Sequence, residues 1–314
     1  MKNEKIKLAL KNGDIVEAQT PLIISASRAT DIPAFYSQWF FNRLNDGYIK
    51  WRNPYNGIDS YISFAKTKFI VFWSKNPRPL LPLLPVLKRR GIGCYIQYTL
   101  NDYTDDCLEP GIPPIAERLE TFKLLVDELG PGAVVWRFDP LILTETISSD
   151  SLLNKIQNIA KQLCGYTEKL VFSFADISTY RKVGRNLLEA GVHYREWTEE
   201  KMIDFARKLS DLNLGLDLAT CAERVDLSQF KISHNRCIDP DLICRLNPEL
   251  LPAVSVLKTD KGQRNLCGCI KSKDIGTYNT CPHGCVYCYA NVSPSSARQN
   301  FMKHQQNPNK DSIL

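Results

Sequence analysis

The chain has 314 residues, 44% hydrophobic and 24% charged, which is enough to build one large α/β barrel or two ordinary domains. No apolar run approaches the ~20 residues that cross a bilayer, and the first residues lack a secretory signal, so we expect a cytoplasmic protein without a membrane partner. The net charge of +6 does not demand a nucleic-acid partner, because a solvated basic surface explains it more simply. In the reducing cytosol, the 11 cysteines favour metal or redox chemistry over a disulfide framework.

Two β-hairpins are predicted, one at the start of the chain and one after the first strand and helix. KIKLALKNGDIVEAQ (residues 5–19) and GYIKWRNPYNGIDSYISF (residues 47–64) each carry an Asn-Gly turn signal between stretches of strand character. Six short, nearly continuous apolar runs predict strands of a sheet that is covered on both faces. These predicted strands are Leu22–Ser25, Phe69–Trp73, Cys94–Thr99, Val134–Phe138, Leu170–Phe174 and Leu214–Leu218.

Helical stretches lie between the predicted strands. Residues 112–130 give the strongest pattern, with apolar side chains on one face and Gly130 at the end. Strand–helix alternation repeated six times predicts a parallel sheet with right-handed crossovers. The other predicted helices cover residues 34–46, 79–91, 149–165 and 195–211.

The periodic patterns weaken after residue 221, and Gly, Asn, Ser and Cys become frequent from residue 258 onward. We therefore predict a β/α domain over residues 1–221 and a cysteine-bearing extension over residues 222–314. The final residues 307–314 are expected to fray.

The run CPHGCVYCYA (residues 281–290) places Cys281, Cys285 and Cys288 at the spacing Cys-x3-Cys-x2-Cys. Chance would produce this spacing about 0.01 times in such a composition. Three thiolates on one loop can hold three corners of an iron–sulfur cube or three positions on zinc. A structural zinc site normally has four protein ligands, whereas a cube held by three cysteines leaves one iron open.

CPHGCVYC resembles the signature of the radical S-adenosylmethionine superfamily, with Tyr287 before the last cysteine. The longer sequence CPHGCVYCYA resembles the corresponding segment in the branch that includes spore photoproduct lyase. Residues 108–130 and FIVFWSKNP (residues 69–77) also resemble segments of that branch. Over its length, the chain resembles an uncharacterised prokaryotic family that has S-R-x-T-D-I-P near the start and a cysteine-rich end.

The resemblance implies an α/β fold, a partial TIM-like (β/α)6 barrel, here with a cysteine-rich C-terminal extension over the barrel mouth. It implies a [4Fe-4S] cluster whose open iron binds S-adenosylmethionine. An electron, supplied by a donor such as flavodoxin or ferredoxin, then cleaves the sulfonium to methionine and a 5′-deoxyadenosyl radical. This radical abstracts hydrogen from a substrate that the resemblance does not supply. The alternative from another class is a non-catalytic iron–sulfur or zinc protein for electron transfer or partner binding.

The position of the three cysteines departs from the superfamily, where they follow the first barrel strand. Here that loop reads SRATDIP (residues 27–33) and has no cysteine. Either the C-terminal segment folds back over the barrel mouth, or the chain is circularly permuted with AVSVLK (Ala253–Lys258) as a relocated strand. In both cases the open iron is expected over the carboxyl ends of the strands.

Four further cysteines are candidates for a second, fully ligated [4Fe-4S] cluster. Cys221 follows the sixth predicted strand, Cys237 lies in NRCIDP, and Cys267 and Cys269 form a CGC run. Zinc at the same positions and ordinary thiols both remain open. The remaining cysteines, for which packing is the expectation, are Cys94, Cys107, Cys164 and Cys244.

Polar residues near the ends of the predicted strands supply the other site candidates. Arg28, Asp31, Arg137 and Asp139 are the catalytic candidates, because polar groups in or just after buried strands need a reason. A helix cap would also explain Asp31, and an internal ion pair would explain Arg137 with Asp139.

The candidates for binding the cofactor are Lys75, Asn76, Gln97, Glu109 and Tyr287. Glu109 is expected to hydrogen-bond a ribose or to brace a loop. Tyr287 is expected to shield the cluster, approach adenine or simply pack. His283, inside the cysteine loop, could be a ligand, but the stronger expectation is that its ring donates to a cluster sulfur.

Overall fold

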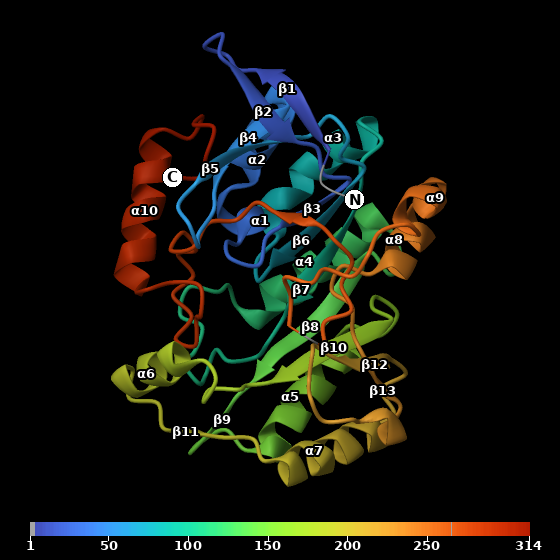
Figure 1. Cartoon of the computed structure of the whole chain (residues 1–314). Helices are drawn as coiled ribbons and strands as arrows, with labels where there is room; N and C mark the ends of the chain where they lie inside the picture. Colours follow the sequence, from blue (N-terminus) through green and yellow to red (C-terminus); the bar gives the residue numbers. More distant parts are fainter. Residues whose placement is uncertain (1–3, 265) are drawn as a thin grey trace.

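The computed structural model describes residues 4–264 and 266–314. The fold is mixed α/β, with one eight-stranded sheet in the order β13-β12-β10-β8-β7-β6-β3-β14 (Figure 1). Every neighbouring pair in this sheet is parallel. Within the described residues the outer strands β13 (Ile232–His234) and β14 (Lys273–Asp274) pair on one side only, so the sheet does not close into a barrel.

All six predicted strands lie in this sheet, in sequence order. The prediction was wrong at the start of the sixth strand, because Leu214–Leu216 precede it. Asn213 and Gly215 take positive φ there, in the turn that leaves the preceding helix. The six strands are β3 (Ile23–Ala26), β6 (Phe69–Ser74), β7 (Gly93–Thr99), β8 (Val134–Leu141), β10 (Lys169–Phe174) and β12 (Asp217–Thr220).

Alternate strand residues face two different cores. In β6, Ile70 and Phe72 join the larger apolar cluster, which the helices supply, whereas Phe69 and Val71 join a smaller one. The smaller cluster is completed by the C-terminal segment through residues such as Ile243 and Val254. Because both faces are covered, the strands read as continuous apolar runs.

The helices on the larger core largely follow the predictions. The first breaks at Tyr36 into α1 (Ile32–Phe35) and α2 (Ser37–Asp46), and the second begins as the 3₁₀ helix η1 (Arg78–Leu83) before α3 (Leu84–Arg89). Prolines prevent a regular start there. The others are α4 (Ile115–Leu129), α5 (Ser149–Gln162), capped by Ser148, α7 (Glu199–Asp211), capped by Thr198, and the unpredicted α6 (Arg181–Glu189).

Both predicted hairpins are confirmed as antiparallel pairs, and they join in one sheet of order β1-β2-β5-β4. A short pair, β9 with β11, was not predicted. The strands are β1 (Lys5–Ala9), β2 (Ile15–Gln19), β4 (Tyr48–Arg52), β5 (Asp59–Ser63), β9 (Leu143–Thr144) and β11 (Tyr194–Arg195).

The segment after residue 221 adds strands to both edges of the large sheet. The prediction of a strand at Ala253–Lys258 was wrong, because the chain forms α9 (Leu251–Val254), which has Pro252 at a helix-starting position. The expected fraying at the end was also wrong, since Ile313 is buried. The other elements of this segment are η2 (Ser228–Phe230), α8 (Pro240–Leu246), η3 (Pro248–Leu250) and α10 (Pro294–Gln306), which runs along one side of the molecule in Figure 1.

Across the described residues, none of the helices combines the length and apolar character that a bilayer crossing requires.

Candidate functional site

The cysteine loop, residues 281–288, is reached directly from the edge strand β14. β14 pairs in parallel with β3, matching Lys273 to Ile24 and Asp274 to Ser25. The Asp274 carboxylate accepts hydrogen bonds from Ser25 Oγ at 2.7 Å and from the Arg28 backbone N–H at 3.1 Å. These contacts make β14 the neighbour of the first predicted strand and send the chain over its carboxyl end.

Contacts with two different segments hold the cysteine loop at this end of the sheet. Val286 N–H donates to the Leu108 carbonyl at 3.0 Å, and the Tyr36 hydroxyl donates to the Thr280 carbonyl at 2.6 Å. A Cβ at Gly111 would lie 2.2 Å from the His283 carbonyl oxygen, so only glycine allows this approach. The cysteine loop therefore lies over the segments that follow β3 and β7.

The three thiols of the cysteine loop are shielded from solvent to different degrees. Cys285 is buried, whereas Cys281 and Cys288 are half-buried. Burial raises the pKa of Cys281 to about 12 and that of Cys285 well above its ordinary value. The charges of Cys281 and Cys288 also raise the pKa of Cys285. Cys281 and Cys285 therefore hold their protons firmly unless a metal displaces them.

No preformed group of three or more His, Cys, Asp or Glu side chains that could hold a metal ion occurs in the described part of the chain. Any metal must therefore be bound with some movement of the thiols.

Three of the predicted cofactor contacts hydrogen-bond with one another beneath the cysteine loop: Lys75, Glu109 and Tyr287. Lys75 Nζ lies 2.7 Å from Glu109 Oε1 and 2.9 Å from the Tyr287 hydroxyl. The Tyr287 hydroxyl also donates to Glu109, and Asn101 Nδ2 donates to Tyr287 at 3.1 Å. Burial opposes ionisation of Glu109, but the charges of Lys75 and Arg118 hold its pKa below the ordinary value. Glu109 thus braces a loop, one of its two expected roles.

Asp31 fastens the cysteine loop from the other side. Its carboxylate caps α1 through Ala34 N–H at 3.0 Å and accepts from Ser74 Oγ at 2.7 Å. His283 Nε2 lies 2.7 Å from the same carboxylate, and His283 Nδ1 lies 3.2 Å from the Gly111 carbonyl. The prediction that His283 donates to a sulfur was wrong, because both ring nitrogens are engaged by oxygen atoms. Burial raises the pKa of Asp31, but the hydrogen bond and the charge of His283 counteract this effect. The pKa of Asp31 is therefore below its ordinary value.

Four cysteines come together from distant parts of the chain, and we call this group the thiol quartet. Its members are Cys221, Cys237, Cys267 and Cys269. Cys221 Sγ and Cys237 Sγ are 3.6 Å apart. Cys269 hydrogen-bonds with the thiols of Cys237 and Cys267. The hydrogen bond from Cys269 is the main reason why the pKa of Cys267 falls to about 7. The four cysteines grouped from the sequence are therefore neighbours in space.

The thiol quartet is surrounded by other predicted site residues. Arg137 NH1 lies 3.3 Å from Cys237 Sγ and 3.1 Å from Gln97 Oε1, while Arg137 NH2 pairs with Asp139. Gln97 Nε2 donates to the Cys237 carbonyl at 3.0 Å. The internal ion pair expected for Arg137 and Asp139 is present, and it lies at the quartet.

The last two predicted site residues, Arg28 and Asn76, do not lie at the cysteine loop. Arg28 stacks over the Trp73 ring at 4.8 Å and directs NH2 at Cys269 Sγ, 3.8 Å away. Asn76 is half-buried, and its backbone N–H donates to Ser74 Oγ at 3.0 Å. Arg28 therefore lies beside the thiol quartet, and Asn76 shapes the turn after β6.

Asn101 and Ser173 were missed by sequence reasoning. Asn101 Oδ1 accepts from Asp139 N–H at 2.9 Å, so Asn101 joins the quartet side to Tyr287 and Glu109. Ser173 Oγ donates to Asp139. Asn101 follows β7 by two positions, and its place after a strand end was the available signal.

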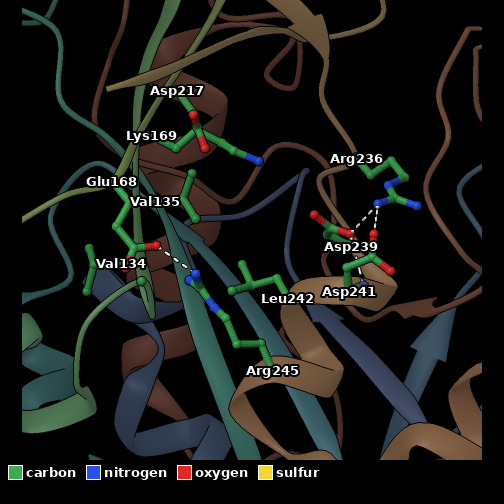
Figure 2. A pocket seen from close by; sticks show the side chains of 11 residues that line it. Val134, Val135, Glu168, Lys169, Asp217, Arg236, Asp239, Asp241, Leu242 and Arg245 are labelled. Atoms are coloured by element: carbon green, nitrogen blue, oxygen red, sulfur yellow. Dashed lines mark hydrogen bonds and ion pairs between the residues drawn. The ribbon is translucent and has the colours of Figure 1, made fainter. Parts of the chain in front are cut away.

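A separate cavity of about 320 Å³ lies at the amino ends of the strands (Figure 2). Val134, Lys169 and Asp217, which begin β8, β10 and β12, line it, and an Arg245–Glu168 ion pair of 2.8 Å crosses it. None of the described cysteines lines this cavity, so it is distinct from both cysteine groups.

The comparisons with known proteins give a family without an assigned function. A search of curated proteins found no match, and a search of solved structures found none. The model of one family, described as "Domain of unknown function (DUF1848)", matches residues 23–290, which include the sheet, the quartet and the cysteine loop. The chain belongs to this DUF1848 family.

Proposed function

We propose that the protein is a radical S-adenosylmethionine enzyme that binds a [4Fe-4S] cluster through Cys281, Cys285 and Cys288. The observation that carries the proposal is the order strand, then three-cysteine loop, at the edge of a parallel sheet. β14 lies beside β3 and leads into the cysteine loop over the carboxyl ends of the strands. Parallel α/β sheets bind their ligands at this end.

We interpret the open eight-stranded sheet as the partial TIM-like barrel of that superfamily, with β14 in the position of its first strand. The chain would then be circularly permuted, because β14 follows the other strands in sequence yet pairs next to β3. This explains why SRATDIP, after β3, has no cysteine. The relocated strand is β14 instead of Ala253–Lys258.

The residues present suit a three-thiolate cluster. One short loop supplies three thiols, and the charge of Lys75 lowers the pKa of the buried Cys285 thiol against the effect of burial. The other nearby cysteines form their own hydrogen-bonded group, which leaves the fourth corner of a cube for an exogenous ligand. When bound, such a cluster supplies the electron that cleaves S-adenosylmethionine.

The protein's own residues would orient and shield this centre. The hydrogen bonds of Tyr287 with Glu109 and Lys75 keep the cysteine loop against the segments after β6 and β7. Asp31 and His283 hold the other side of the loop, and both side chains are buried. This bracing holds the cysteine loop in one position, while the cofactor performs the chemistry.

The test is anaerobic reconstitution followed by reduction with dithionite. The loaded protein is expected to contain about four irons at the three-cysteine loop and to convert S-adenosylmethionine to methionine and 5′-deoxyadenosine. Cys281→Ser should abolish the cleavage, whereas Cys164→Ser, at an exposed thiol, should not change it. A fully iron-loaded protein that leaves S-adenosylmethionine intact would contradict the proposal and favour a non-catalytic iron–sulfur protein.

A further inference from the structure

The thiol quartet lies on the face of the sheet that the C-terminal segment covers. Cys221, Cys237 and Cys269 belong to the smaller apolar core, and Cys267 packs against it. Its members come from the end of β12, the segment after β13 and the loop before β14. A link among these four positions would therefore fasten the whole C-terminal segment to the sheet.

The distance between the sulfur atoms of Cys221 and Cys237 fits one metal ion better than a cube. Four sulfurs bound tetrahedrally to one zinc at ~2.3 Å stand ~3.8 Å from each other. Cys221 Sγ and Cys237 Sγ are 3.6 Å apart, and Cys269 interacts with the thiols of Cys237 and Cys267. In a cube each thiolate binds a different iron, so the sulfurs must lie farther apart than around a single ion.

Nitrogen donors around the quartet point at the sulfurs. Arg137 NH1 and Asn235 Nδ2 lie 3.3 Å and 3.5 Å from Cys237 Sγ, and the Ile238 N–H donates to Cys269 Sγ at 3.3 Å. Arg264 NH2 lies 3.6 Å from Cys221 Sγ. A neutral thiol is a weak acceptor, whereas a metal-bound thiolate is negative and accepts such bonds well.

The charge balance agrees with this chemistry. The guanidinium of Arg28 has no ion pair among the described residues, yet it points at Cys269 Sγ from 3.8 Å. Four thiolates around one divalent ion carry a net charge of about −2, which would balance the guanidinium groups at this partly buried place.

We propose that Cys221, Cys237, Cys267 and Cys269 bind one structural zinc ion that fixes the C-terminal segment on the sheet. On binding, the four thiols lose their protons and exchange their mutual hydrogen bonds for the metal, and no electrons are transferred. Because no preformed metal site is found in the described residues, binding requires the thiols to move closer together. A site closed by four protein ligands is structural and keeps no open position.

The test is metal analysis of the full chain and substitution of the zinc by cobalt. We expect about one zinc per chain, and we expect cobalt to give the visible absorption of a tetrahedral tetrathiolate site. Cys267→Ser should lose the zinc and the tetrathiolate spectrum, while Cys164→Ser, at an exposed thiol, should keep both. Because Cys267→Ser could also disturb folding, the cobalt titration of the unaltered chain decides independently.

Two results would overturn the proposal. One is the absence of a tetrathiolate cobalt spectrum in the unaltered chain, and the other is the loss of about four irons in place of zinc in Cys267→Ser. The Cys281→Ser chain separates this proposal from the proposed function, because it should lose cluster iron and retain the zinc.

Discussion

Glu109 shows how single residues at this site depend on partners that are remote in sequence. Lys75 and Tyr287, its hydrogen-bonding partners, are separated by 212 positions. Each residue could be predicted separately, because Lys75 follows a strand and Tyr287 lies in the cysteine motif. The pairing could not be predicted, because local patterns carry no information about contacts between distant segments.

Replacing Glu109 with Gln should be strongly destabilising. The change leaves Lys75 and Arg118, both largely buried, without their carboxylate, and breaking a buried pair in this way costs roughly 3–5 kcal/mol. The measurement is urea denaturation of the metal-free chain at neutral pH. Glu120→Gln is the matched control, since its ion pair with Arg78 is exposed and should change stability by less than about 1 kcal/mol. Equal losses in the two variants would refute the bracing role of Glu109.

The quartet illustrates a residue-scale prediction that the structure extends. The grouping of the four cysteines could be predicted from their type and from positions near strand ends. Which metal suits them could not, because that depends on sulfur spacing and on N–H donors such as Asn235 and Ile238.

At the scale of elements, the long apolar strands and the amphipathic helices were predictable, whereas the short ones were not. β14 has only two residues, and neither is apolar. Its place in the sheet comes from the Asp274 hydrogen bonds to Ser25 and Arg28 instead of from a periodic pattern. Ala253–Lys258 has the better strand composition, yet packing and Pro252 make its first residues helical.

The contact between Gly111 and the cysteine loop gives an element-scale prediction. In Gly111→Ala the new Cβ would lie 2.2 Å from the His283 carbonyl oxygen, so the loop must move away. We expect a loss of about 1–3 kcal/mol and faster amide hydrogen exchange in residues 281–288. The control is Gly262→Ala, where the added Cβ would meet only the Asp260 carboxylate at 3.3 Å. Unchanged exchange in the Gly111 variant would show that the loop is not held by this contact.

At the scale of the whole molecule, the chain forms one parallel sheet with different covers on its two faces. Helices between the strands cover one face, and this half was predictable from the strand–helix rhythm. The C-terminal segment covers the other face and supplies both edge strands, β13 and β14. That arrangement depends on long-range pairing, so the sequence indicated an extension but not its contacts.

The two cysteine groups have different proposed roles. We propose that the thiol quartet fixes the C-terminal segment and that the cysteine loop after it carries the reactive centre. Arg137, Asp139 and Asn101 connect the two groups through a continuous path of hydrogen bonds. Disturbing the quartet should therefore weaken the cysteine loop as well.

Electron paramagnetic resonance of the reduced, reconstituted protein with and without S-adenosylmethionine tests whether one iron of the cluster is open to an exogenous ligand. We expect a cluster signal whose g-values shift when S-adenosylmethionine is added, and a hyperfine coupling when its amino nitrogen carries an isotopic label. An iron–sulfur signal that stays identical and uncoupled at saturating S-adenosylmethionine would mean that no iron is open, and the proposed radical S-adenosylmethionine activity would then be wrong.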